Sequence, residues 1–326
     1  SAASDVYKRQ GEKVHEELQI LCTANIPNEP GKIKYTQMLN SDGGIETDLT
    51  VICIEKNYFR IVSSAANREH DKFHILKHIS KDVKLTDVTE DYCCLGLFGP
   101  KSRDMISSIS SDDFSNENFK FATAKFVKID DVELWAQRIS YVGELGFELY
   151  VKKENALKLF DILMDKGKSF KLSLCGMHAM DIMRMESGYL HWGHDISPEE
   201  NQFEAGLSFA VSFKKNINFI GRAALEKKRD KKDHKKFKML ILNHSKEGAP
   251  LLLHDEPIYL KDKIVGRTTS GCYSFNYNKN LAFGYINSGL TSDQIDKQAF
   301  EIEVEKKKYP ASVITRPLND KKLSSL

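Results

Sequence analysis

The chain has 326 residues, of which 41% are hydrophobic and 29% are charged, and its formal net charge is +2. This length exceeds that of one small domain, so we expect two or three domains. No apolar run is long enough to span a bilayer as a helix, and lysines and arginines are spread along the chain. These features argue against a membrane protein and against a nucleic-acid-binding protein. The six cysteines show no Cys-x-x-Cys spacing, which favours reduced thiols over zinc ligands or disulfides.

The beginning of the chain does not look like the start of a domain. Its first ten residues, SAASDVYKRQ, resemble translated adaptor sequence, and we expect residues 1–10 to be a non-native tail outside the fold. Apolar residues at helical spacing then predict a helix within residues 12–25.

Three strands and a second helix are expected next. The strands fall at residues 35–40, 45–53 and 57–63, and the helix at 67–79. A hairpin turn at 41–44 joins the first two strands, and Gly43 and Gly44 are expected to supply its positive φ angles.

A second series of strands and helices follows, with a different kind of region after it. Strands are expected at 91–98, 124–129, 132–140 and 146–151, and helices after Pro100, at 154–165 and at 177–188, the last capped by Gly188. This order predicts α+β layers and not a doubly wound sheet. Short, evenly spaced strands from 237 to 319 predict a small all-β barrel or sandwich. The basic run at 226–238 is interpreted as a solvated helix end and linker, with a nucleic-acid patch as the alternative.

Common catalytic motifs are missing from the sequence. It contains no GxGxxG, GxxxxGK[ST] or GxSxG pattern, which argues against a dinucleotide loop, a P-loop and a hydrolase nucleophile elbow. His191, His194 and Asp195 are residue types that bind metals, but Gly193 between the histidines disrupts a shared helical face. We therefore expect no metal site there and interpret these residues as structural or pocket-lining.

Several segments instead resemble one family in a consistent order from about residue 11 to 319. They are residues 35–51, YVGELGFE at 141–148, HAMDIMRME at 178–186 with the HWGHDI that follows, FIGRAAL at 219–225, HDEPIY at 254–259, VGRTTSG at 265–271 and YPASVITRPL at 309–318. Together they resemble the folate-binding C-terminal region of the dimethylglycine/sarcosine dehydrogenase family, which is similar to the glycine-cleavage T-protein.

The resemblance implies an α+β fold with two mixed α/β, ferredoxin-like layers followed by a small C-terminal β-barrel. We accordingly expect a folate-binding domain at residues 11–235 and a barrel domain at 236–326. Because the family's domain normally begins some tens of residues earlier, the chain is expected to be an N-terminally truncated fragment. Its first layer would then lack a strand and a helix and would have an unpaired sheet edge.

Alternation along the second strand points to a polar face. Glu46, Asp48 and Thr50 lie on one face, and the residues between them lie on the core face. From the residues alone, Asp48 is either a solvated carboxylate or part of a cavity. The resemblance implies that Asp48 is part of a cavity, because it matches the carboxylate beside the pterin N5 of tetrahydrofolate.

The same resemblance implies the remaining site residues. Asp48 and Tyr141 form the catalytic pair, and Glu148 holds the pterin by accepting two parallel hydrogen bonds. Further folate contacts are expected from Tyr35, Thr50, Val62, Ser64 and Arg184. Two points stay open. Arg184 could form an internal ion pair with Glu186, and the role of Arg60 is undecided because it replaces an aromatic residue of T-proteins. Met180 stands where T-proteins often carry arginine, which removes one cationic anchor for the glutamate tail.

The expected function is tetrahydrofolate-dependent capture of a formaldehyde-level carbon unit, giving 5,10-methylenetetrahydrofolate. FAD is expected only in an upstream domain of the parent chain, which would oxidise an N-methylglycine and pass its one-carbon unit to this domain. The alternatives are a free-standing aminomethyltransferase, a folate-dependent demethylase, and a non-catalytic folate-binding module. The family resemblance implies the bacterial cytoplasm or the mitochondrial matrix.

Overall fold

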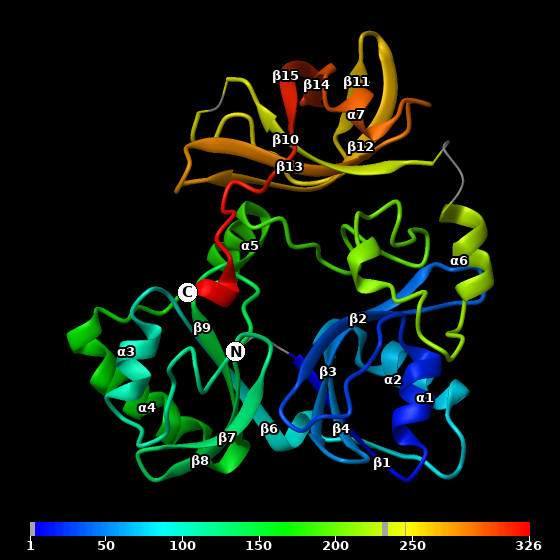
Figure 1. Ribbon diagram of the computed structural model, residues 1–326. Helices are drawn as coiled ribbons and strands as arrows, with labels where there is room; N and C mark the ends of the chain where they lie inside the picture. Colours follow the sequence, from blue (N-terminus) through cyan, green and yellow to red (C-terminus); the bar gives the residue numbers. More distant parts are fainter. Residues whose placement is uncertain (1–3, 230–233, 245) are drawn as a thin grey trace.

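Two α/β layers and a barrel make up the fold (Figure 1). The computed structural model describes residues 4–229, 234–244 and 246–326. Each layer has one mixed-order sheet with helices on its outer face, and the barrel lies beyond both layers. The predicted α+β class with a C-terminal barrel is therefore confirmed.

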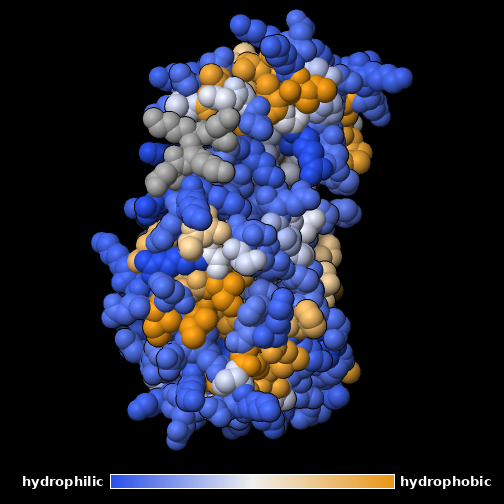
Figure 2. All heavy atoms as spheres, turned by 90° about the vertical axis from the view of Figure 1, so that its right-hand side faces the viewer, coloured by the Kyte–Doolittle hydropathy of each residue, from blue (hydrophilic) through white to orange (hydrophobic). Residues whose placement is uncertain are grey.

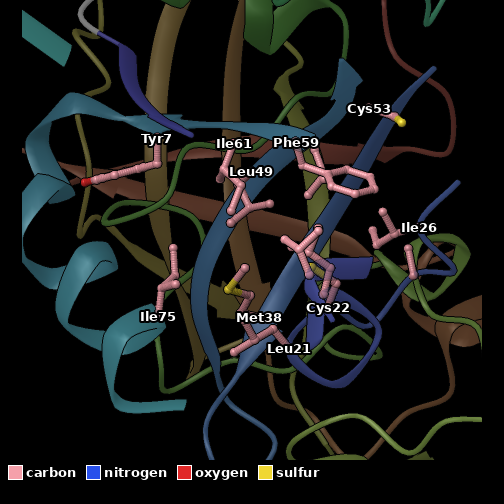
Figure 3. Packing of buried hydrophobic residues seen from close by; sticks show 14 of the residues in the cluster. Tyr7, Leu21, Cys22, Ile26, Met38, Leu49, Cys53, Phe59, Ile61 and Ile75 are labelled. Carbon is pink, nitrogen blue, oxygen red and sulfur yellow. The ribbon is translucent and has the colours of Figure 1, made fainter. Parts of the chain in front are cut away.

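The first layer is a five-stranded sheet in the order β2-β3-β4-β1-β5. Its strands are β1 (Ser4–Gln10), β2 (Ile33–Leu39), β3 (Ile45–Glu55), β4 (Tyr58–Ser64) and β5 (Lys84–Asp87), and its helices are α1 (Val14–Leu21) and α2 (Arg68–His78). One face of the sheet packs on these helices through a buried apolar core. Figure 3 shows Leu49, Phe59 and Ile61 from the sheet beside Leu21 and Ile75 from the helices. Period-2 alternation in the strands and helical spacing in α1 direct these side chains to the same space.

Strand β1 bears on two expectations. Its residues Ser4–Gln10 pair antiparallel with both β4 and β5 and so lie inside the sheet. Tyr7 and Arg9, on one face of β1, are fully buried; the Tyr7 hydroxyl donates to the Arg68 carbonyl at 2.6 Å, and Arg9 pairs with Glu17 at 3.2 Å. The expectation that this segment lies outside the fold is wrong for residues 4–10, and residues 1–3 lie outside the described residues. The expected unpaired edge does not lie at β4, because β4 pairs with β3 on one side and with β1 on the other.

The second layer is a four-stranded sheet in the order β6-β9-β8-β7. Its elements are β6 (Tyr92–Phe98), α3 (Ser102–Ser107), β7 (Ala124–Ile129), β8 (Val132–Gln137), β9 (Gly146–Lys152) and α4 (Ala156–Gly167). Helices α3 and α4 pack on one face of this sheet. The other face packs on the first sheet, and the apolar contact between them, here called the inter-sheet layer, includes Ile52, Val62, Cys94, Trp135 and Tyr150.

Helix α5 (Met177–Glu186) leads from the second layer toward the barrel. Gly188 follows its end with φ +73° and donates to the Met185 carbonyl at 3.0 Å, so the predicted glycine cap is confirmed. The long segment after it leads to α6 (Arg222–Arg229). The basic run predicted as a helix end and linker starts within α6 and ends in the first barrel strand, but its residues 230–233 lie outside the described residues.

The barrel is closed in the order β10-β13-β12-β11-β14-β15. Its strands are β10 (Lys236–Leu242), β11 (Pro257–Leu260), β12 (Lys263–Ser274), β13 (Lys279–Ile286), β14 (Ala299–Val304) and β15 (Lys307–Ile314), with the short α7 (Ser292–Ile295) between β13 and β14. Of the two predicted forms, barrel or sandwich, the structure has the barrel.

The face of the molecule that carries α1, α2 and α6 is predominantly hydrophilic (Figure 2). Figure 2 views the molecule from the side of α1, α2 and α6 and shows separate hydrophobic patches on an otherwise hydrophilic face. Phe73 and Leu76 of α2 are among the exposed large hydrophobic residues. Within the described residues, no helix is both long enough and apolar enough to cross a membrane.

Candidate functional site

Three strands of the first sheet present one row of predicted site residues. Thr50 pairs with Tyr35 on one side and with Val62 on the other, so the three side chains share a face. Asp48 lies two residues before Thr50 and therefore on the same face. Along β3 this face is partly exposed while the alternate residues are buried, which confirms the predicted alternation. In the turn before β3, Gly43 has φ +77°, whereas Gly44 is required because a Cβ there would lie 2.0 Å from the Pro198 carbonyl oxygen.

The carboxyl group of Asp48 is held from the neighbouring strand. The Gln37 Nε2 donates to Asp48 Oδ1 at 2.8 Å. Burial raises the pKa of Asp48 from 3.8 to about 6; hydrogen bonding by Tyr35 and Gln37 opposes this rise, and the negative charge of Asp71 adds to it. Asp48 is therefore mostly ionised at neutral pH but close enough to its pKa to exchange a proton.

Tyr141 lies in the segment between β8 and β9, on the Asp48 side of the fold. Burial raises the pKa of the Tyr141 phenol; the charge of Arg184 opposes this effect, and the charges of Asp195 and Asp48 add to it. The phenol donates to the Leu190 carbonyl at 3.0 Å, and its ring stacks on Tyr189 at a centroid distance of 6.2 Å. The structure thus brings Tyr141 within electrostatic range of Asp48, but its hydroxyl is bound to the backbone.

Glu148 faces the same inter-sheet region from the second sheet. It lies on β9 two residues before Tyr150, whose hydroxyl donates to Glu148 Oε2 at 2.8 Å and whose ring packs in the inter-sheet layer. Burial raises the pKa of Glu148, and the hydrogen bond from Tyr150 opposes the rise. Across the sheet its partner is Gln137, which is fully buried and whose amide oxygen and nitrogen both lack a hydrogen-bond partner among the described residues.

The predicted residues of β4 divide between the inter-sheet layer and the strand end. Val62 packs in the inter-sheet layer, and Ser64 ends the strand as a partly exposed residue. Arg60 is buried between the sheets, with its guanidinium carbon 4.9 Å from the Tyr92 ring centre and 5.5 Å from that of Trp135. This stacking accounts for the arginine, because its flat cation packs between two aromatic rings.

Arg184 lies within electrostatic range of Tyr141, but its guanidinium is bound by other residues of the protein. Its Nε donates to Asp181 at 2.8 Å, its Nη1 to Asp195 at 2.6 Å and to the Tyr189 carbonyl at 3.2 Å, and its Nη2 to Ser270 at 2.8 Å. All three nitrogens thus have protein partners, and the side chain is 2% exposed.

The anticipated ion pair between Arg184 and Glu186 is wrong. Glu186 instead accepts hydrogen bonds from Ser274 at 2.6 Å and Asn276 at 2.8 Å. In the HWGHD segment Asp195 is likewise a structural acceptor, because Arg184, Thr269 and Ser270 all donate to its carboxylate.

Sequence reasoning missed three residues near the site. Gln37 follows Tyr35 by two positions in β2, so alternation could have found it. Gln137 becomes notable only through its pairing with Glu148. Phe209, 73% exposed, stacks on Tyr35 at a centroid distance of 6.2 Å, although 174 positions separate them along the chain, and no local pattern predicts such a contact.

The fold, two α/β layers followed by a closed six-stranded barrel, is that of the aminomethyltransferase type. The GCVT N-terminal domain matches residues 5–215, starting inside β1, and the glycine cleavage T-protein C-terminal barrel domain matches residues 235–320. The chain therefore belongs to the glycine cleavage T-protein (GCVT) family. The crystal structure of the glycine cleavage system aminomethyltransferase T from Bartonella henselae has the same fold, with a TM-score of 0.85 at 20% identity over 98% of this chain and 85% of that one.

Two curated relatives are much longer than this chain. It is 34% identical to 4-methylaminobutanoate oxidase (formaldehyde-forming) of Paenarthrobacter nicotinovorans, over 94% of this chain and 36% of that protein. It is 33% identical to mitochondrial dimethylglycine dehydrogenase of Homo sapiens, over 90% of this chain and 34% of that protein. The chain thus spans about a third of the length of these relatives.

Proposed function

We propose that this chain binds tetrahydrofolate between its two α/β layers and transfers to it a carbon unit at the formaldehyde level. The observation that carries the proposal is the pair of carboxyl groups on the facing sheets. Asp48 projects from the first sheet with a pKa of about 6. Glu148 projects from the second beside Gln137, whose amide has no hydrogen-bond partner in the part of the chain that the structure describes. Membership of the GCVT family supports the same assignment.

The residues of this region fit a reduced pterin. Its 2-amino group and adjacent ring N–H are parallel donors, which an ionised carboxylate such as Glu148 can accept together. The amide of Gln137, buried without a protein partner among the described residues, offers one more donor and one more acceptor beside it. Thr50, Val62 and Tyr35 form the opposite wall on the first sheet.

Bound tetrahydrofolate supplies the amine nitrogens that take up the carbon unit, and the protein supplies a proton acceptor and fixed geometry. The ionised Asp48 accepts the proton that leaves N5 or holds N5 in the orientation for attack. Tyr35 and Gln37 keep the Asp48 carboxylate in place. Because an amine is already a nucleophile, positioning provides most of the rate gain.

The names of the relatives support a source for the carbon unit. One is described as formaldehyde-forming and the other as a dimethylglycine dehydrogenase, and both are about three times as long as this chain. We infer that this chain corresponds to the C-terminal part of an FAD-dependent dehydrogenase acting on an N-methylated glycine. In that parent protein an upstream flavin domain oxidises the N-methyl group, and this domain captures the product.

The binding is tested by titrating the chain with tetrahydrofolate under anaerobic conditions and measuring the heat of binding by calorimetry. We expect saturable binding that weakens about 10- to 100-fold in Glu148→Ala, because two hydrogen bonds to a charged group are lost. Glu133→Ala is the matched control, since Glu133 lies exposed on the neighbouring strand β8 and should leave the affinity unchanged. A folded chain that does not bind tetrahydrofolate contradicts the proposal. A chain that binds it but transfers no carbon from formaldehyde is a folate-binding module without catalysis.

A further inference from the structure

We propose that Gln37 is a positioning residue that keeps Asp48 ionised and in a single orientation for the transfer step. The proposal rests on the function proposed above, in which Asp48 acts as an ionised group. Gln37 lies on β2 directly opposite Asp48 on β3, is fully buried, and donates through Nε2 to Asp48 Oδ1 at 2.8 Å.

The direction of this hydrogen bond depends on the charge of Asp48. An ionised carboxylate can only accept, so it selects the amide orientation in which the Gln37 nitrogen faces Asp48. A protonated Asp48 could also donate to the amide oxygen, and the opposite orientation would then be allowed. Because an N–H group bonds more strongly to a carboxylate than to a neutral carboxyl group, the contact favours the ionised form of Asp48.

The Gln37 amide also hydrogen-bonds the Tyr35 hydroxyl, which itself hydrogen-bonds Asp48. The Gln37 Oε1 is buried and lacks a hydrogen-bond partner among the described residues. A leucine of similar size would fill this space without burying an unpaired acceptor. What glutamine provides here, and an apolar residue would not, is hydrogen bonding to Asp48 and to the Tyr35 hydroxyl that also holds Asp48.

The groups around Asp48 shift its pKa in opposite directions. Burial raises the pKa of Asp48; Tyr35 and Gln37 lower it, and Asp71 of α2 raises it. Tyr141 also interacts with the charge of Asp48, while His70 contacts Asp71 at 3.1 Å. Of the two donors to Asp48, Tyr35 and Gln37, only Gln37 has no titrating group of its own, so its removal gives a simple prediction.

The first test is a carboxyl-carbon NMR titration of Asp48 in the full chain without folate, assigned with Asp48→Asn. We expect Gln37→Leu to raise the pKa of Asp48 by about one pH unit, from about 6 to about 7. Gln19→Leu is the matched control, because Gln19 is a buried glutamine of α1 whose amide bonds to Ile26, and it should leave that pKa unchanged. An unchanged pKa in folded Gln37→Leu overturns the proposal. If that variant does not fold, Gln37→Met, which keeps a linear side chain of similar length, is read in the same way.

The second test is the pH dependence of carbon transfer from formaldehyde to tetrahydrofolate. In Gln37→Leu the acid limb of kcat/KM, which reports the groups of the free enzyme, should move to higher pH by the same amount as the pKa of Asp48. A loss that is equal at every pH would indicate a purely structural role and would also overturn the proposal. The NMR result needs no folate, so a chain that fails to bind folate would contradict the proposed function while still deciding whether Gln37 controls Asp48.

Discussion

At the scale of single residues, Asp48 is a carboxyl group that the fold makes harder to ionise. Its pKa rises from 3.8 to about 6 because burial outweighs the hydrogen bonds from Tyr35 and Gln37. A folded-state pKa above the unfolded value means that the folded chain holds the proton more tightly between about pH 3.8 and pH 6. The stability contributed by this group therefore falls as the pH rises through that window and stays low above it. A group with this cost is typical of a functional site.

We expect Asp48→Asn to separate stability from function. At pH 7.5 the variant should have a free energy of unfolding higher by about 1–3 kcal/mol, because it no longer buries a charge. Carbon transfer should fall by about 10²- to 10⁴-fold at the same pH. Urea unfolding at several pH values checks the first effect, and the two proteins should converge in stability below about pH 4. Equal stability at pH 7.5 would show that the ionised Asp48 carries no cost.

At the scale of elements, period-2 patterns predicted what lies within a strand but not what lies across from it. The alternation of Thr47, Leu49 and Val51 with polar residues is local, and β3 has the predicted faces. The placement of Asp48 and Glu148 on the facing sides of two sheets depends on how the sheets pack, which no strand pattern encodes, and only the family resemblance suggested it. Strand β1 was missed for another reason: its segment was excluded on its likeness to an adaptor, although Tyr7 and Arg9 alternate as a strand requires.

The contribution of strand β1 to the stability of the first sheet can be tested by deletion. Deleting residues 1–10 should expose the edges of β4 and β5 and remove the Tyr7 side chain from the core in Figure 3. Loss of one large buried aromatic side chain alone costs about 3–5 kcal/mol. We therefore expect the shortened chain to unfold at much lower urea concentration or not to fold. Gln10→Ala, at an exposed position of the same strand, should behave as the full chain does. An unchanged urea midpoint after the deletion would show that β1 contributes nothing to the sheet.

At the scale of the whole molecule, the α/β layers are joined to the barrel by polar contacts that the sequence did not reveal. Glu186 was an unsuitable partner for Arg184 because residues two apart on a helix point in nearly opposite directions. The actual partner, Asp195, comes from the segment after α5, and Ser270 from β12 of the barrel completes the contact. Long-range pairs of this kind need the assembled fold. The evenly spaced short strands predicted an all-β region, either a barrel or a sandwich, and only the family resemblance favoured the barrel.

The two acids that contact Arg184 allow a matched comparison. Asp195 is fully buried and accepts from Arg184, Thr269 and Ser270, whereas the Asp181 side chain is 43% exposed. Asp195→Ala leaves a buried guanidinium without its inner partner, which costs about 3–5 kcal/mol. Asp181→Ala removes a solvent-screened pair and should cost less than about 1 kcal/mol. Thermal unfolding should show a large fall in Tm only for Asp195→Ala. If this junction couples the barrel to the layers, the Asp195→Ala variant should also unfold in two distinct transitions, one for the barrel and one for the layers. Equal effects of the two substitutions would mean that Asp195 is not needed to stabilise the buried charge of Arg184. The coupling between the layers and the barrel would then have to come from the apolar cluster of Met185, Leu281 and Phe283.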